Sequence, residues 1–289
     1  MRSPALAGVF YEKDPSLLLE QVQSCLAGEA GPAVEAIGVV VPHAGYVYSG
    51  RIAGRLWART IVPERVVILA PNHTGLGRPI ALSLEDAWVT PLGRVPVDLD
   101  FGRAVLSECR DAVADELAHV EEHAVEVHLP FLQVRNPSAR IVPLCLRPMS
   151  LQACEALAMA LARVVSKTPE PTLLVASSDL NHHEPLAVAA RKDRMVLDRI
   201  AGLDPAGLYQ TVVAHHVTMC GFVPAVVMLF ASRALGARIA EVVAYGTSAD
   251  LDGDASSVVG YAGVRIGRER SAPVNGCLGG TVERGHQTR

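Results

Sequence analysis

The stretch VVVPHAGYVYSG, residues 39–50, decides the fold and points to the function. Its three consecutive valines are typical of a buried strand, because β-branched side chains pack well on a pleated sheet. The strand ends in an imidazole and a glycine turn instead of an ordinary polar loop. The same form recurs in VVILAPNHTG, residues 66–75, and in LLVASSDLNHH, residues 173–183. We therefore predict strands that each end in a histidine or an aspartate.

Working outward from these stretches, strands alternate with helical patterns along most of the chain. Strands are predicted at 36–41, 66–70, 80–84, 141–146, 172–177, 241–245 and 257–266. The helix after the first histidine turn should have Ser49 as its N-cap, and GFVPAVVMLFASRALG, apolar nearly all round, should be a buried helix. The alternation predicts an α/β fold, a three-layer αβα sandwich whose central sheet is mostly parallel or mixed.

Domain organisation follows from the same pattern. Residues 1–267 contain no repeat and no Pro/Gly-rich linker, which predicts a single α/β domain. Residues 268–289 are polar and glycine-rich without periodicity, which predicts a flexible C-terminal tail.

Composition narrows the class of protein. The net charge is −4, with acidic and basic residues interspersed, so a nucleic-acid-binding surface is not expected. The first residues lack the apolar core of a secretory signal, and no apolar run is long enough to span a membrane. Six scattered cysteines without a CxxC pair indicate reduced thiols. We expect a cytoplasmic globular protein.

The strongest chemical signal is the position of His43, His73 and Asp179, each just beyond a predicted strand. Ligands of open α/β sheets bind outside the carboxyl ends of the strands, so these side chains should converge on one crevice. Two histidines and a carboxylate form the metal-binding triad of non-haem Fe(II) oxygenases and also suit zinc hydrolases. The competing interpretation is that each is a hydrogen-bonded structural residue.

Two further segments carry candidate groups. His182, after Asp179, is a candidate acid/base, whereas the alternative is that both cap a helix beginning near Glu184-Pro185; the role of His183 is open. Cys220 precedes the apolar helix, whose positive N-terminus should lower the thiol pKa; the alternative is an inert buried thiol.

The segment EEHAVEVHLPFL contains His123, Glu126 and His128. On a helix the two histidines would lie about 140° apart and could not bind one metal from one face, whereas Glu126 and His123 would share a face. A hydrogen-bonding role is therefore expected for these histidines.

Taken in order, PHAGYVYSG, PNHTG, EHAVEVHLPFL, SSDLNHH and TMCG resemble the Memo family. Its bacterial and archaeal members are often labelled AmmeMemoRadiSam system protein B. The resemblance runs from about Ser3 to Gly267. It implies a LigB-like αβα fold, similar to class III extradiol dioxygenases, which cleave catechol rings with Fe(II).

The resemblance also implies roles for individual residues. His43 and His73 match the family's metal-binding histidines, and Cys220 matches the cysteine that joins them where extradiol enzymes have a glutamate. Asp179 would then be either an auxiliary ligand or a residue that contacts the ligands without binding the metal itself. His182 stands at the position of the acid/base of the extradiol enzymes.

In this interpretation Tyr46 or Asp179 orients the substrate. The chain departs from the family at Leu180 and His183, where many members have aromatic residues, and both positions are expected to line the pocket.

The leading hypothesis is a non-haem iron protein, a dioxygenase-like oxidoreductase acting with O₂ on a small oxygen-bearing substrate. Fe(II) is the expected metal, with zinc or copper as alternatives. The alternative functions are a zinc-dependent hydrolase and a non-catalytic metal-binding or adaptor protein. The family label further implies a radical S-adenosylmethionine protein and an AMMECR-type protein as partners.

Overall fold

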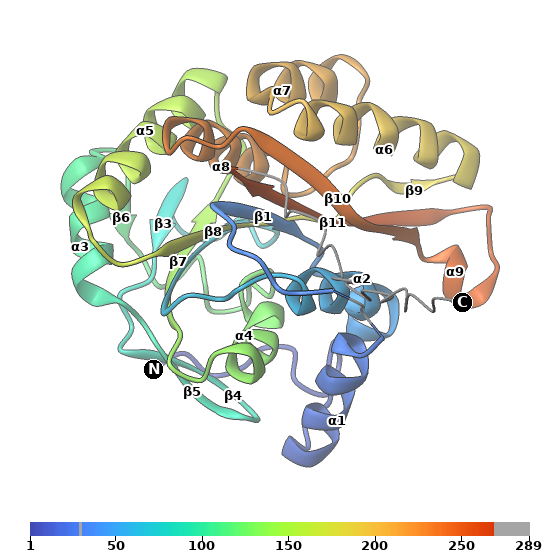
Figure 1. Ribbon diagram of the computed structural model, residues 1–289, viewed down its shortest axis with the longest axis horizontal. Coiled ribbons are helices and arrows are strands. Elements are labelled where there is room, and N and C mark those ends of the chain that lie inside the picture. Colours follow the sequence, from blue (N-terminus) through green and yellow to red (C-terminus); the bar gives the residue numbers. More distant parts are fainter. Residues whose placement is uncertain (29–30, 269–289) are drawn as a thin grey trace, which may run out of the picture.

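A computed structural model describes residues 1–28 and 31–268, and in it one mixed sheet separates two layers of helices (Figure 1). The predicted flexible tail lies outside the described residues except for Arg268. None of the helices in these two ranges is long and apolar enough to cross a membrane.

The helices alternate with the strands, as the sequence pattern predicts. The helices are α1 (Pro15–Leu26), α2 (Tyr46–Ala58), α3 (Leu99–Glu108), α4 (Leu129–Arg135), α5 (Leu151–Lys167), α6 (Leu186–Ala201), α7 (Pro205–Ala214), α8 (Phe222–Ala234) and α9 (Ala249–Asp252), with a short 3₁₀ helix at Glu126–His128. The strands are β1 (Gly38–Val41), β2 (Arg65–Pro71), β3 (Ile80–Leu82), β4 (Ala87–Thr90), β5 (Gly93–Pro96), β6 (Val113–Ala114), β7 (Arg140–Leu146), β8 (Thr172–Ser177), β9 (His182–Glu184), β10 (Ile239–Thr247) and β11 (Val258–Gly267).

The order of the strands places the carboxyl ends of three neighbouring strands side by side. The main sheet runs β10-β11-β1-β8-β2-β7-β3-β6. β8 pairs in parallel with β1 on one side and β2 on the other, and β2 pairs in parallel with β7. β11 and β10 extend the sheet antiparallel on one side, and β3 pairs antiparallel with β7 on the other. The predicted parallel-to-mixed sheet is confirmed.

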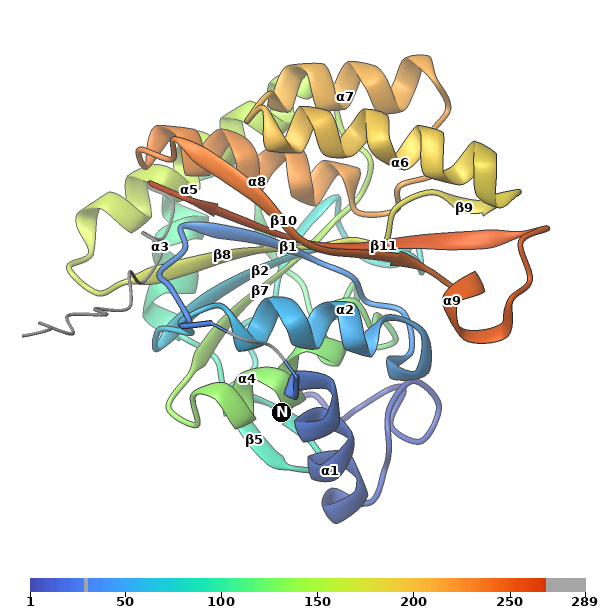
Figure 2. The same ribbon diagram turned by 45° about the vertical axis from the view of Figure 1, so that its right-hand side comes forward.

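Alternate residues of the central strands face opposite helix layers. Val40 packs in the core that holds residues of α5 and α8, whereas Val39 and Val41 pack in the core that holds residues of α1, α2 and α4. Figure 2 shows α5, α6, α7 and α8 on one side of the sheet and α1, α2 and α4 on the other. Both faces of the sheet are therefore covered, which confirms the three-layer sandwich.

The predicted start of one helix was wrong. Helix α2 begins at Tyr46 with Gly45 as N-cap, four residues before the predicted N-cap Ser49, and the Ser49 hydroxyl donates to the Ala44 carbonyl instead of capping free N–H groups. The segment at His123 is an irregular turn, and helix begins only at Glu126. Strands β4, β5, β6 and β9 were not predicted; they are only two to four residues long.

Buried Glu126 fastens the N-terminal segment to the loop before α4. Its carboxylate accepts hydrogen bonds from the Tyr11 hydroxyl (2.6 Å), from the backbone N–H groups of Ala5 (2.8 Å) and Leu6 (3.0 Å), and from the Arg2 guanidinium. Both Glu126 and Arg2 are buried, so their charges have little access to water. The N-terminal segment and the loop are therefore held together by one paired carboxylate.

Replacing Glu126 with alanine should lower the free energy of unfolding by about 3–5 kcal/mol, because the buried Arg2 charge would lose its partner. Urea denaturation of the two proteins measures this difference. The exposed neighbour Glu121 provides the matched control, since Glu121→Ala should change stability by no more than about 0.5 kcal/mol. Equal stability of Glu126→Ala and wild type would show that the pair does not hold the segment.

A second buried carboxylate joins α6 to the sheet. Asp193 accepts hydrogen bonds from the Asn181 N–H and from the Tyr245 hydroxyl, both at 2.9 Å. A Cβ atom at Gly260 would lie 2.0 Å from its Oδ2 atom, so only glycine fits at this point of β11. Burial raises the pKa of Asp193 to about 6 despite these two hydrogen bonds. Ionised Asp193 therefore costs folding free energy.

The stability of the protein should consequently depend on pH through Asp193. Its pKa is higher in the folded chain than the unfolded value of about 3.9, so its contribution is fully present below about pH 4 and is lost as the pH rises through about 6. Relative to Asp193→Asn, whose amide does not titrate, wild type should lose at most about 3 kcal/mol between these limits. Urea denaturation from pH 4 to 7 measures the difference, and a pH-independent difference would refute the assignment.

Candidate functional site

The parallel strands bring the predicted residues together as expected. His43 follows β1, Asp179 follows β8 and His73 follows β2, each two residues beyond the end of its strand. Cys220 joins them from the loop before α8. One donor atom from each of His43, His73 and Cys220 lies within 4.8 Å of the others.

The orientation of His43 is fixed by a buried serine. Its Nδ1 lies 2.8 Å from the Ser177 hydroxyl oxygen, and its Nε2 lies 3.2 Å from the Cys220 sulfur. The Ser177 hydroxyl donates to the Ala124 carbonyl (2.6 Å), so its oxygen accepts the Nδ1–H of His43. Burial, followed by the neighbouring histidines, holds the pKa of His43 well below 6.5. His43 therefore presents a neutral Nε2 lone pair toward Cys220.

The orientation of His73 is fixed by a buried glutamate. The Glu122 carboxylate lies 2.9 Å from His73 Nδ1, and it accepts the backbone N–H groups of His73 (2.6 Å) and Ala124 (2.9 Å). Burial alone would lower the pKa of His73, but the hydrogen bond and charge of Glu122 outweigh it and raise the pKa. With Nδ1 held by Glu122, Nε2 is the free donor of His73.

Asp179 and His182 are held by backbone groups. The Asp179 Oδ1 atom accepts the N–H groups of His43 (2.8 Å) and Ala44 (3.3 Å), while Oδ2 lies 4.0 Å from His43 Nε2. His182 Nδ1 donates to the Thr218 carbonyl at 2.9 Å, which leaves its Nε2 free. One donor atom each of Asp179, His182 and Cys220 lies within 4.8 Å of the others. Burial raises the pKa of Asp179 to about 6 and lowers the pKa of His182.

The prediction of a lowered thiol pKa at Cys220 was wrong. Burial and the nearby Asp179 carboxylate raise the pKa of Cys220, and these effects outweigh the hydrogen bonds that would lower it. The alternative role for Asp179 and His182 as helix caps also does not occur, because α6 begins after Pro185 and has no side-chain cap.

The other candidate residues lie around this cluster in different ways. His128 is buried and bonds the Ser177 hydroxyl through Nε2 at 2.8 Å, which matches the predicted hydrogen-bonding role. The His123 ring stacks on that of His73, with ring centroids 4.9 Å apart. His123 also belongs to a third group of closely spaced donors, with His73 and Glu122. A metal role for His123 thus depends on Glu122, which the hydrogen bonds to His73 already occupy.

Two residues do not stand where their expected roles require. Tyr46 is buried, and its hydroxyl donates to the Val127 carbonyl at 2.6 Å, so we assign it no contact with a substrate. Leu180 is fully buried in the core shared with α5 and α8 instead of lining the site. By contrast, His183 is exposed beside the site, with its ring centroid 5.8 Å from that of His182 and a positive φ of 58°.

The cluster has the donor chemistry of a transition-metal site. Neutral imidazole nitrogens, a thiol and a carboxylate are ligands for iron, zinc and copper. Two ligands of one such ion lie at most about 4.4 Å apart, so donors within 4.8 Å of one another need only small movements to share one. The hydrogen bonds that the histidines donate to Ser177, Glu122 and Thr218 fix which nitrogen of each histidine is available, as outer partners do in metal sites.

Sequence reasoning did not identify these outer partners. Ser177 was visible in the quoted SSDLNHH stretch, but nothing in its type distinguished it from an ordinary strand residue. Glu122 could have been sought as an acidic neighbour of His123. Thr218 acts partly through its backbone carbonyl, which no sequence motif reveals.

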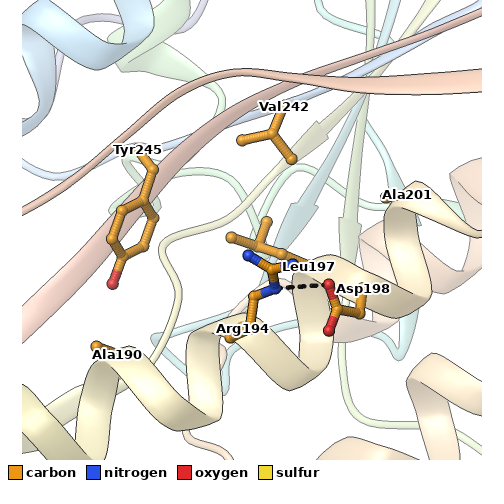
Figure 3. A pocket seen from close by; sticks show the side chains of 7 residues that line it. All are labelled: Ala190, Arg194, Leu197, Asp198, Ala201, Val242 and Tyr245. Carbon is orange, nitrogen blue, oxygen red and sulfur yellow. Dashed lines mark hydrogen bonds and ion pairs between the residues drawn. The ribbon is translucent and has the colours of Figure 1, made fainter.

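A pocket elsewhere on the molecule has different chemistry. It lies between α6 and β10, where Leu197, Val242 and Tyr245 supply much of the lining (Figure 3). Its one carboxylate, Asp198, is paired with Arg194 at 2.7 Å. The pocket shares no residue with the histidine cluster, and we place the chemistry in the cluster.

Comparisons with known proteins agree with the motifs. The family model described as Memo-like protein matches residues 2–265. A MEMO1 family protein of Methanopyrus kandleri is 42% identical, covering 91% of this chain and 98% of its own. Two further proteins carry the same family description. The protein of Thermotoga maritima is 40% identical, and the match covers 90% of this chain and 97% of that protein. The protein of Methanothermobacter thermautotrophicus is 38% identical, and the match covers 91% of this chain and 99% of that protein.

Replacing Glu122 with glutamine should lower the pKa of His73. The carboxylate is what raises that pKa against burial, and the neutral amide keeps the shape of the side chain without its charge. Titration of the His73 ring by NMR measures the change. Glu121→Gln, an exposed neighbour, should leave the His73 titration unchanged; an unchanged titration in Glu122→Gln would contradict the assignment.

Proposed function

The chain belongs to the Memo-like protein family, and we propose that it is a metalloprotein with a non-haem Fe(II) site held by His43, His73 and Cys220. One observation carries the proposal. In both histidines a protein partner occupies Nδ1, so Nε2 remains free in a space shared with the cysteine sulfur. Hydrogen bonds that orient the free nitrogen lone pairs of several histidines toward one point are typical of a metal centre.

We further propose that the centre is a dioxygenase-like oxidoreductase acting on a small oxygen-bearing substrate. When bound, Fe(II) would supply a Lewis-acid position and redox chemistry with O₂. The protein itself supplies proton transfer and orientation. The contacts of His182 support the first role, because its Nδ1–H is bonded to Thr218 and the Nε2 lone pair is available to accept a proton from the substrate.

The contacts of Asp179 support a role in orienting the substrate. Its Oδ1 is occupied by two backbone N–H groups, whereas Oδ2 faces the cluster. Access should be from the side of His73 and His182, because the His73 side chain is 35% exposed while His43 and Asp179 are buried. A small molecule entering there would meet His182 before the buried groups.

The first test is elemental analysis of protein purified without oxygen. We expect about one iron per chain in wild type and a loss of iron in His43→Ala, because that variant removes a lone-pair donor. His183→Asn is the matched control, since it removes an exposed imidazole next to the site. Asparagine also tolerates the positive φ that the backbone has at this position. Iron retained in His43→Ala would overturn the assignment of the ligands.

Turnover is tested on the same preparations by O₂ uptake with catechols as probe substrates. His182→Gln should retain iron and lose activity by about 100-fold or more, the usual contribution of a positioned acid/base. Activity that persists without oxygen would instead favour the zinc-dependent hydrolase. Bound metal without turnover would favour the metal-binding or adaptor role. That a radical S-adenosylmethionine protein and an AMMECR-type protein are partners of this chain stays a prediction.

A further inference from the structure

The histidine cluster contains more metal donors than the proposed iron site uses. Asp179 and His182 each direct a free atom at Cys220, and the three donors lie within 4.8 Å of one another. This triad shares only Cys220 with the His43–His73–Cys220 triad. The two triads therefore meet at one sulfur atom.

Each donor of the second triad is positioned by protein contacts on its far side. Thr218 holds His182 twice, by accepting its backbone N–H at Oγ1 (2.7 Å) and its Nδ1–H at the carbonyl (2.9 Å). Two backbone N–H groups hold Asp179 Oδ1 and leave Oδ2 free. The loop of Cys220 is fixed by the Gly221 N–H, which donates to Ser178 Oγ at 3.0 Å. The donors are thus oriented before any ligand binds.

The close packing of Gly221 fixes the sulfur further. A Cβ atom at Gly221 would lie 2.1 Å from the Ser177 carbonyl oxygen, so the backbone beside Cys220 lies directly against the end of β8. The strand that positions Asp179 therefore also positions Cys220. Movement of one donor relative to the other would require β8 and the loop before α8 to separate.

The chemistry of this triad suits a borderline-soft cation. An imidazole nitrogen, a carboxylate oxygen and a sulfur are three of the ligand types that zinc takes in proteins. Asp179 is buried, and its ion-pair contact is with the imidazole of His43 instead of a lysine or arginine. A divalent cation would supply the positive charge that a buried carboxylate and a thiolate need.

We infer that the histidine cluster holds a second metal subsite, formed by Asp179, His182 and Cys220, which takes Zn²⁺ or a similar borderline-soft ion while Cys220 is shared with the site at His43 and His73. This inference rests on the proposed function, because it extends the same site. Binding releases the thiol proton of Cys220 to solvent as the sulfur–metal bond forms. It also occupies His182 Nε2, so filling this subsite switches off the proton transfer proposed for His182.

The test is the zinc stoichiometry of the full chain, stripped of metal and kept reduced under nitrogen. Isothermal titration with Zn²⁺, followed by elemental analysis after desalting, should give two zinc ions per chain in wild type. His182→Gln and, independently, Asp179→Asn should each give one, and His43→Ala should also give one. Cys220→Ser should bind neither ion tightly, because it removes the shared donor.

His183→Asn is the control and should keep two zinc ions per chain, since His183 lies beside His182 but outside the triad. Circular dichroism and thermal melting of each stripped variant show that it is folded. If His182→Gln fails to fold, Asp179→Asn tests the same subsite.

The outcomes separate this inference from the proposed function. One zinc ion per chain, lost in His43→Ala and unaffected by His182→Gln, would overturn the second subsite and leave the first intact. One ion, lost in His182→Gln and unaffected by His43→Ala, would overturn the proposed iron ligands and leave this triad as the metal site. No zinc in wild type would overturn both.

Discussion

Parallel hydrogen bonding of β8 to β1 on one side and to β2 on the other is the constraint on which the site depends. Parallel neighbours end at the same edge of a sheet, so the residues that follow them are delivered to one place regardless of their separation along the chain. His43 and Asp179 are 136 residues apart, yet the backbone N–H of one donates to the carboxylate of the other. Residues that are far apart in the sequence therefore lie next to each other at this edge of the sheet.

Once the side chains are gathered, buried polar contacts decide what they can do. Ser177 bonds His43 and His128 at the same hydroxyl, and Glu122 holds the ring and backbone of His73. Each contact selects one imidazole nitrogen as the available donor. The loop that carries Glu122 is in turn attached to the N-terminal segment, because Arg2 donates to the Glu122 carbonyl at 2.7 Å. Orientation at the site thus depends on residues remote from it in sequence.

The fold and the central residues of the site could be predicted from the sequence because both follow from local patterns. Runs of β-branched residues identify buried strands, and a histidine directly after such a run must lie at the carboxyl edge. Tyr46 shows the limit of this reasoning: it lies close to His43 in sequence, but the helix that begins at that residue turns its ring into the core. The roles of Glu122 and Thr218 depend on contacts across the fold, which no local pattern contains.

The balance between burial and charge links the structure to its chemistry. Burial lowers the pKa of His43 and His182, which keeps their lone pairs available, and the same burial raises the pKa of Asp179 and Cys220, which opposes their anionic forms. Without a bound cation, burial therefore favours the uncharged form of all four groups. A metal cation would bind the neutral nitrogen lone pairs and would also stabilise the thiolate and the carboxylate that burial disfavours. The charge that the buried cluster lacks is thus the charge that a metal ion would bring to it.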